Sequence, residues 1–198
     1  MSALKQEVHT VTKQEYFKYR KHYEGKYELH DGTIIAMAGG SPSHGRLGMM
    51  ASRLIYNLVE ANGCEAFNSD TSVLIEAYGN YYFPDTSIVC GTAEFDSDDN
   101  LTNPILIVEV LSPSTALFDR NTKFERYKTL PTLEYYLLIW QDAPRLELFT
   151  RPENSAAEEW TVTVIEGLDA ELTLPFFTQP LKLTDLYRKV TFEKSDSL

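Results

Sequence analysis

Apolar residues form their most continuous run within residues 103–114, NPILIVEVLSPS. Branched apolar side chains occupy consecutive positions there, so both faces of a strand built from this stretch would be covered. We therefore predict that it forms the central strand of a mixed or parallel sheet. Glu109 interrupts the run near its end, and a carboxylate in such a strand is costly to bury unless a cation or hydrogen bonds satisfy it.

Helix signals occur on both sides of this strand. Thr12 and Glu15 have the spacing of a capping box, which predicts a short helix through about residue 20. Ser41-Pro42 then begins an amphipathic helix with apolar residues at intervals of three and four, and Asn62-Gly63 ends it. The other helical segments that we predict are 115–129 and 182–188.

Strand-like runs account for most of the remaining chain. Asp31-Gly32 separates two of them, and this dipeptide is a strong signal for a β-hairpin. The predicted strands besides the central one are 27–30, 33–37, 64–76, 81–90, 134–140, 145–149, 160–165 and 172–174. This order predicts an α/β (α+β) fold with a central mixed β-sheet flanked by helices, an N-terminal hairpin and a C-terminal β extension.

The length of 198 residues fits a single domain, with a core over about 9–187 and a loose tail at 188–198. No apolar run approaches the roughly 20 residues of a membrane helix, and the N-terminus lacks a signal-peptide pattern. Cys64 and Cys90 form neither a metal motif nor a disulfide framework. We therefore expect a cytoplasmic protein in a reducing setting.

The net charge of −11 disfavours broad, non-specific binding to nucleic acid, which depends on basic surface. It leaves room for a local basic path, because Lys and Arg cluster between residues 13 and 26. Much of the acidic excess lies in residues 94–99, EFDSDD, which we predict to be a solvated loop because like charges repel.

Two acids are the strongest candidates for chemistry. Asp85 lies at the start of one apolar segment, and Glu109 lies near the end of the next. Carboxylates on neighbouring strands can hold one Mg²⁺ ion and leave sites for water and phosphate, and a metal so placed promotes phosphodiester hydrolysis. The alternative is a turn aspartate after Pro84 and an ion-paired core glutamate.

The ordered motifs, rather than these two acids alone, resemble a known family. They are Tyr27-Glu28-Leu29 with Asp31-Gly32, Ser41-Pro42-Ser43-His44, Pro84-Asp85, Val108-Glu109-Val110-Leu111-Ser112-Pro113-Ser114-Thr115, and Asp119, Lys123 and Tyr127. From about His9 to Tyr187 the chain is similar to restriction endonuclease-like domains of the PD-(D/E)xK nuclease superfamily. The resemblance implies a restriction-endonuclease-like core and Mg²⁺-dependent hydrolysis of DNA, with Mn²⁺ as a substitute ion.

One departure from the superfamily pattern concerns the lysine expected two residues after the glutamate. Leu111 stands there, and the nearest substitute is Lys123 on the following helix, as in the branch that the chain resembles. Lys123 would orient the attacking water or neutralise developing charge. The alternative is a surface pair of Asp119 with Lys123, four residues apart on the helix.

Three further residues are candidates with open alternatives. Glu28 is either a third carboxylate of the site or an exposed strand residue, and His44 either assists catalysis or is a hydrogen-bonded core histidine. The carbonyl of Val110 is a possible additional metal ligand, while Tyr127 is expected in the core. The predicted catalytic set is thus Asp85, Glu109, Lys123, Glu28 and His44, with Asp85, Glu109 and Val110 as metal ligands.

We expect an endodeoxyribonuclease, and two alternatives remain open. One is a catalytically degenerate nuclease fold that binds or regulates, favoured by the acidic surface and the missing proximal lysine. The other is a metal-dependent hydrolase of another phosphate ester. DNA is the expected substrate, a homodimer would suit cleavage of two antiparallel strands, and a partner protein would supply any specificity. Glycine-rich phosphate loops, nucleophile elbows and zinc spacings are absent from the sequence.

Overall fold

The structure is a computed structural model that describes residues 10–37, 39–113, 115–153 and 159–192. Its α-helices are α1 (Lys13–His22), α2 (Pro42–Val59), α3 (Phe124–Tyr127) and α4 (Leu183–Leu186). Its strands are β1 (Tyr27–His30), β2 (Thr33–Ala36), β3 (Cys64–Asn68), β4 (Val73–Ile75), β5 (Asn80–Tyr82), β6 (Thr86–Cys90), β7 (Leu106–Leu111), β8 (Tyr135–Trp140), β9 (Arg145–Thr150), β10 (Thr161–Glu166), β11 (Glu171–Leu172) and β12 (Leu181–Lys182). A π-helical segment, Phe118–Lys123, leads directly into α3.

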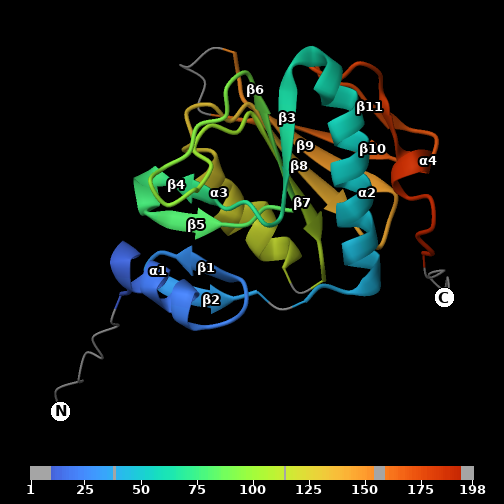
Figure 1. Ribbon diagram of the computed structural model, residues 1–198. Coiled ribbons are helices and arrows are strands. Elements are labelled where there is room, and N and C mark those ends of the chain that lie inside the picture. The colour runs from blue at the N-terminus through green and yellow to red at the C-terminus, as the bar shows by residue number, and fades with distance from the viewer. Residues whose placement is uncertain (1–9, 38, 114, 154–158, 193–198) are drawn as a thin grey trace.

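A six-stranded mixed sheet forms the centre of the molecule, in the order β10-β9-β8-β7-β6-β3 (Figure 1). β7 and β8 are parallel, and the other neighbours in this sheet are antiparallel. All six residues of β7 are buried, as its continuous apolar pattern predicts. The predicted fold class, a mixed sheet flanked by helices, is therefore confirmed.

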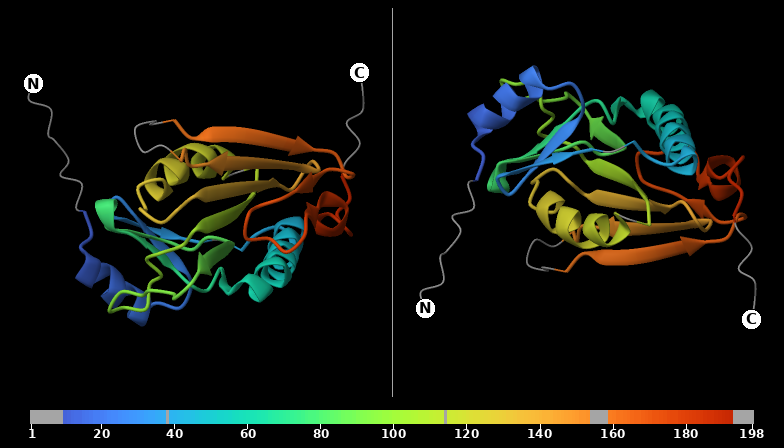
Figure 2. Two further views of the ribbon diagram at one scale, coloured as in Figure 1. Left: turned by 90° about the horizontal axis from the view of Figure 1, so that it is seen from above. Right: turned by 90° about the horizontal axis from the view of Figure 1, so that it is seen from below.

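The two faces of β7 pack against different helices (Figure 2). Leu106, Val108 and Val110 lie in the core that α2 covers, while Ile107 and Leu111 lie in the core that contains α3. Because side chains alternate along a strand, Glu109 projects to the α3 side. The alternation of side chains along β7 thus places Glu109 opposite the π-helical segment.

A second, four-stranded antiparallel sheet, β2-β1-β5-β4, lies beside the first (Figure 1). The predicted hairpin forms β1 and β2, with Asp31 and Gly32 both at positive φ. α1 begins with the predicted capping box and buries Tyr16, whose ring stacks on Tyr81 at 5.2 Å between centroids. This small sheet brings Glu28 on β1 toward the first sheet.

Two predicted strands are wrong, because each divides between the two sheets. Residues 64–76 form β3 and β4, separated at residues 68–71 by a turn in which Thr71 N–H donates to the Asn68 carbonyl. Residues 81–90 form the end of β5 and all of β6, with a break at Phe83-Pro84-Asp85. Proline has no N–H for a strand ladder, and the Phe83 N–H donates to Glu28 Oε1 instead.

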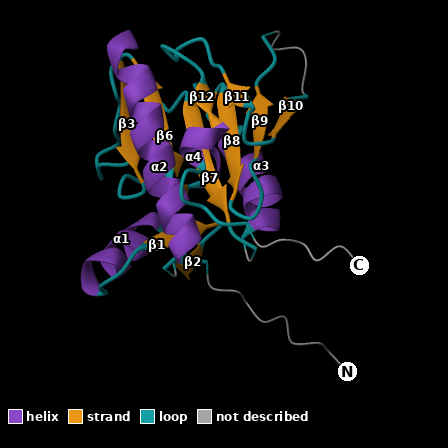
Figure 3. Ribbon diagram, turned by 90° about the vertical axis from the view of Figure 1, so that its right-hand side faces the viewer, coloured by secondary structure: helices purple, strands orange, loops and turns teal. Residues whose placement is uncertain are grey.

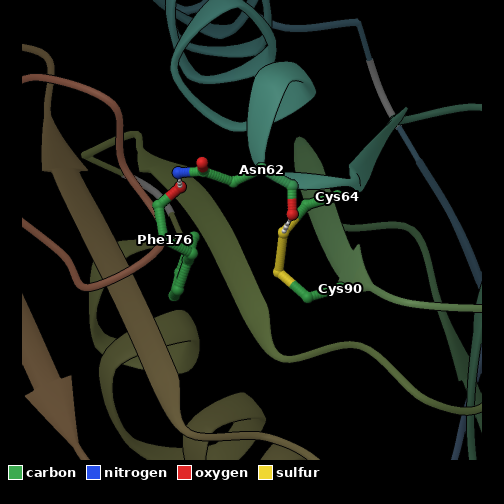
Figure 4. The surroundings of a disulfide bond; sticks show 4 residues. All are labelled: Asn62, Cys64, Cys90 and Phe176. Carbon is green, nitrogen blue, oxygen red and sulfur yellow. Dashed lines mark hydrogen bonds between the residues drawn. A yellow bond between two sulfur atoms is a disulfide. The ribbon is translucent and has the colours of Figure 1, made fainter.

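The expectation of no disulfide is also wrong. Cys64 and Cys90 are directly paired across β3 and β6 and form a disulfide (Figure 4). Nearby, Asn62 Nδ2 donates to the Phe176 carbonyl at 3.1 Å. The register of this antiparallel pair places the two thiols together, although they are far apart in sequence.

The acidic segment 94–99 is a largely exposed loop, as predicted, and two of its carboxylates also contact Lys13. Lys13 Nζ lies 3.2 Å from Asp96 Oδ2 and 3.0 Å from Asp98 Oδ2. The Asp96 carboxylate also accepts hydrogen bonds from the backbone N–H groups of Asp98 and Asn100. The segment is therefore tied to α1. Of the predicted tail 188–198, residues 193–198 lie outside the described residues.

Candidate active site

Lys123 is the centre of a buried cluster of charged side chains. Its Nζ lies 3.1 Å from Glu109 Oε1, 3.2 Å from Glu28 Oε1 and 3.8 Å from Asp119 Oδ1. Lys123, Glu109 and Asp119 are each 5% exposed, and Glu28 is 3% exposed. The ammonium group therefore links the central strand, the N-terminal hairpin and the π-helical segment. An isolated surface pair of Asp119 with Lys123 and an exposed Glu28 are both excluded.

Each carboxylate of the cluster has further partners. Tyr127 donates its hydroxyl proton to Glu109 Oε1 at 3.2 Å. Glu28 accepts the Phe83 N–H through Oε1 at 2.7 Å, and its Oε2 lies 2.6 Å from His30 Nε2. These contacts hold Glu28 in one orientation against Lys123. They offset much of the free-energy cost of burying the Glu28 carboxylate.

Asp85 immediately precedes β6, next to the end of β7. Its Oδ2 accepts the Val110 N–H at 2.7 Å, and its Oδ1 lies 3.3 Å from His44 Nε2. Val110 belongs to the same strand as Glu109, so this hydrogen bond ties the two acidic segments together. His44 comes from the first turn of α2, whose cap is the predicted Ser41.

All five predicted catalytic residues, Asp85, Glu109, Lys123, Glu28 and His44, together with Val110, line one cavity of about 460 Å³. The sequence did not assign every residue of this cluster to the site. His30 was not predicted, although it lies two residues after Glu28 and therefore shares a face of β1 with it. Asp119 and Tyr127, expected as a lysine partner and a core residue, both contact the cluster.

The electrostatics of this cavity favour a bound cation. Burial, assisted by the charges of Asp119, Asp85 and Glu28, raises the pKa of Glu109 well above its ordinary value of 4.5. Burial also raises the pKa of Asp119. The nearby Glu109, Glu28 and Asp119 carboxylates raise the pKa of Lys123 well above its ordinary value despite its burial, so it stays protonated. The ammonium group thus faces more negative charge than it can neutralise.

The oxygen donors that line the cavity suit a Mg²⁺ ion that keeps several of its coordinated water molecules. Across the described ranges, no three His, Cys, Asp or Glu side chains are arranged to hold a metal ion together. Mg²⁺ is commonly bound through one or two carboxylates plus water and substrate phosphate. Asp85, Glu109 and the Val110 carbonyl supply such oxygen atoms, while Lys123 and Tyr127 both contact Oε1 of Glu109, which leaves Oε2 for a ligand.

An ion pair between exposed Arg120 and buried Glu147 joins the π-helical segment to the sheet. Arg120 Nε donates to Glu147 Oε2 at 2.7 Å, and Glu147 on β9 is fully buried. Glu147 pairs in register with Leu138, which in turn pairs with Glu109 on β7. π-helical turns are rare and occur frequently at functional sites. We therefore expect Arg120 to hold the turn that carries Asp119 and Lys123, a role that the sequence did not predict.

The fold and this cavity define a restriction-endonuclease-like protein. The family model described as "Putative restriction endonuclease" (Uma2) matches residues 13–184, and the chain belongs to this family.

Similar proteins cover nearly the same extent of chain. The uncharacterized protein slr1290 of Synechocystis sp. is 32% identical over 182 residues, covering 92% of this chain and 94% of the relative. A second Synechocystis sp. protein, sll1609, is 35% identical over 168 residues, covering 84% and 93%. A solved structure from Anabaena variabilis, described as a putative nuclease belonging to DUF820, has a TM-score of 0.68 at 18% identity and covers 88% of this chain and 96% of that chain. This structural likeness confirms the fold.

Replacing Glu109 with Gln should stabilise the metal-free protein at about pH 8. A carboxyl whose folded-state pKa is raised destabilises the fold progressively as pH rises above its unfolded value of 4.5, and the penalty is complete once pH exceeds the folded-state pKa. One kcal/mol shifts the melting temperature by about 2–4 °C in a domain of this size, so we expect Glu109→Gln to raise it by several degrees. Thermal melts in EDTA across pH measure this, and an advantage that grows toward acidic pH would contradict it.

Arg120→Gln should loosen the π-helical segment more than the matched variant Arg145→Gln does. Arg145 Nη2 also donates to Glu147 at 2.7 Å, but both residues belong to β9. Hydrogen exchange measured by mass spectrometry should therefore accelerate across residues 116–127 in Arg120→Gln only. Equal exchange in this segment for both variants would show that Arg120 does not anchor it.

Proposed function

We propose that the protein is a Mg²⁺-dependent endonuclease that hydrolyses DNA phosphodiester bonds. The observation that carries the proposal is the convergence of Asp85 and Glu109, from neighbouring strands, on one cavity with Lys123 beside Glu109. Membership of a family described as restriction endonucleases supports the same reaction. Among the described helices, none is long and apolar enough to cross a bilayer.

In this mechanism Asp85, Glu109 and the Val110 carbonyl hold the magnesium ion. When bound, the ion polarises the phosphate and lowers the pKa of a coordinated water. Lys123 acts as a fixed cation, because the raised pKa keeps its ammonium group protonated. It orients the attacking water and offsets the negative charge that develops on the phosphate oxygens.

Glu28 and His44 support this arrangement from opposite sides. The carboxylate of Glu28 stays ionised because its pKa is lowered, with the Lys123 charge and the His30 hydrogen bond outweighing its burial. It therefore holds Lys123 in place. The hydrogen bond with Asp85 raises the pKa of His44, which favours a charged imidazole that can contact a phosphate oxygen.

A degenerate fold that only binds or regulates is the second candidate. The absent lysine at position 111 favours it, but Lys123 supplies an ammonium group at the same cluster. A metal-dependent hydrolase of another phosphate ester would use the same groups. A homodimer remains part of the proposal, because two-fold symmetry suits the cleavage of two antiparallel strands.

Asp85→Asn, Glu109→Gln and Lys123→Met should each lower Mg²⁺-dependent nicking of plasmid DNA by about 10²–10⁴-fold, the range for losing a transition-state charge contact or an acid–base group. The matched control is Glu171→Gln, an exposed carboxylate on β11 that should keep full activity. EDTA should abolish nicking. Nicking that persists unchanged in Asp85→Asn would overturn the proposal, and hydrolysis of small phosphodiesters without nicking would favour the other ester hydrolase.

A further inference from the structure

A second hollow, which we call the α2 groove, joins the candidate active site. Its volume is about 810 Å³, and residues of α2, β3 and the turn after β3 line it. Figure 3 shows α2 and β3 as neighbouring elements. Residues lining both the groove and the catalytic cavity include Met37, His44, Phe83 and Asp85. A substrate held at Asp85 would therefore extend directly into the groove.

The lining of the α2 groove is much less acidic than that of the catalytic cavity. It carries Arg53 and Lys26, whose Nζ lies 3.0 Å from Asp70 Oδ1, and Asp85 at the shared boundary is its sole carboxylate among the described lining residues. The catalytic cavity carries Glu28, Glu109 and Asp119 in addition to Asp85. In a chain of net charge −11, a less acidic hollow beside an acidic one separates a phosphate site from a cation site.

Aromatic and apolar groups make up much of the remaining wall. Tyr56 is exposed on α2, Phe67 comes from β3, and Phe83 forms the boundary with the catalytic cavity. Lys26 Nζ lies 5.3 Å from the centroid of the Phe83 ring. Unpaired bases stack on aromatic rings beside a basic path, and each stack contributes about 1–3 kcal/mol.

Two glycines, Gly45 and Gly48, leave the α2 surface that faces the groove without side chains at their positions. An added Cβ at Gly45 would meet no atom within 4 Å, and one at Gly48 would meet Asp85 Oδ1 at 3.7 Å. Since both glycines line the groove, a ligand can approach the helix backbone there. A side chain introduced at Gly45 would enter the groove rather than the core.

We propose that the α2 groove binds the unpaired nucleotides next to the scissile phosphate, so the enzyme acts on single-stranded or locally melted DNA. The inference rests on the proposed function and deepens it. A hollow of this volume is of the size that encloses a small ligand, on the order of 300–1,000 Å³, and a base must leave the duplex stack to enter it. Extruding bases from a duplex costs a few kcal/mol, which a strand that is already unpaired avoids.

The test measures binding apart from cleavage. A fluorescein-labelled oligothymidylate and a duplex of the same length are titrated with the protein in EDTA, and binding is followed by fluorescence anisotropy. The single strand should bind more tightly than the duplex. Gly45→Trp, which fills the groove, should weaken single-strand binding by about tenfold or more, the loss expected for one base stack. The matched control Asn57→Trp, an exposed α2 position outside the groove lining, should bind as the unmodified protein does.

Arg53→Gln gives an independent measure. It should weaken single-strand binding and reduce the slope of log K against log salt by about one, as for one lost phosphate contact. Tighter binding of the duplex, or unchanged binding in a Gly45→Trp protein that melts like the unmodified protein, would overturn the groove assignment. If nicking is absent while Gly45→Trp still weakens strand binding, the proposed function fails and the groove assignment stands.

Discussion

The structure depends on a single buried ammonium group. Lys123 lies within 4 Å of carboxylate oxygens from Glu28, Glu109 and Asp119, three residues that belong to three different elements. Removing the ammonium group would leave these buried carboxylates without a cation, and an uncompensated buried charge typically costs about 3–5 kcal/mol. The N-terminal hairpin, the central strand and the π-helical segment are therefore held in one mutual arrangement, which forms the candidate active site.

The same cluster explains why the chain tolerates acids in its core. With Asp85 included, four carboxylates line a cavity in which Lys123 is the permanently charged cation among the described lining residues. Burial, together with repulsion from the neighbouring carboxylates, raises the pKa of Glu109, so ionisation of this residue at neutral pH opposes folding. A divalent cation would offset that repulsion. Stability given up at a functional site in this way is common, and the surrounding core of β7, α2 and α3 supplies the compensation.

The sequence predicted the presence of helices and strands better than where each begins and ends. It also predicted the acidic residues of the site better than the partners that surround them. The hairpin at Asp31-Gly32, the capped α2 and the central strand follow from local signals that the structure keeps. The runs 64–76 and 81–90 failed, because apolar residues continue on both sides of a turn and nothing local shows that two sheets share them. The Cys64–Cys90 bond likewise depends on a strand register that one sequence does not reveal.

The depth of Lys123 illustrates the same limit. Its spacing from Asp119 is that of an ordinary surface pair, and only the packing of the π-helical segment against β7 turns both side chains inward. Glu147 carried the same signal as Glu109, an acid within an apolar strand, yet its partner Arg120 lies in a distant element. Local patterns indicate which polar residues need partners, whereas tertiary packing decides which partners they find.

The most direct test of this account is a crystal structure of the protein soaked with Mn²⁺ and examined by anomalous diffraction. The account predicts a peak between the carboxylates of Asp85 and Glu109, with the Val110 carbonyl among the ligands and the Lys123 ammonium group beside the coordinated water. A fully occupied Mn²⁺ site elsewhere, with Asp85 and Glu109 bound to no ion, would contradict it.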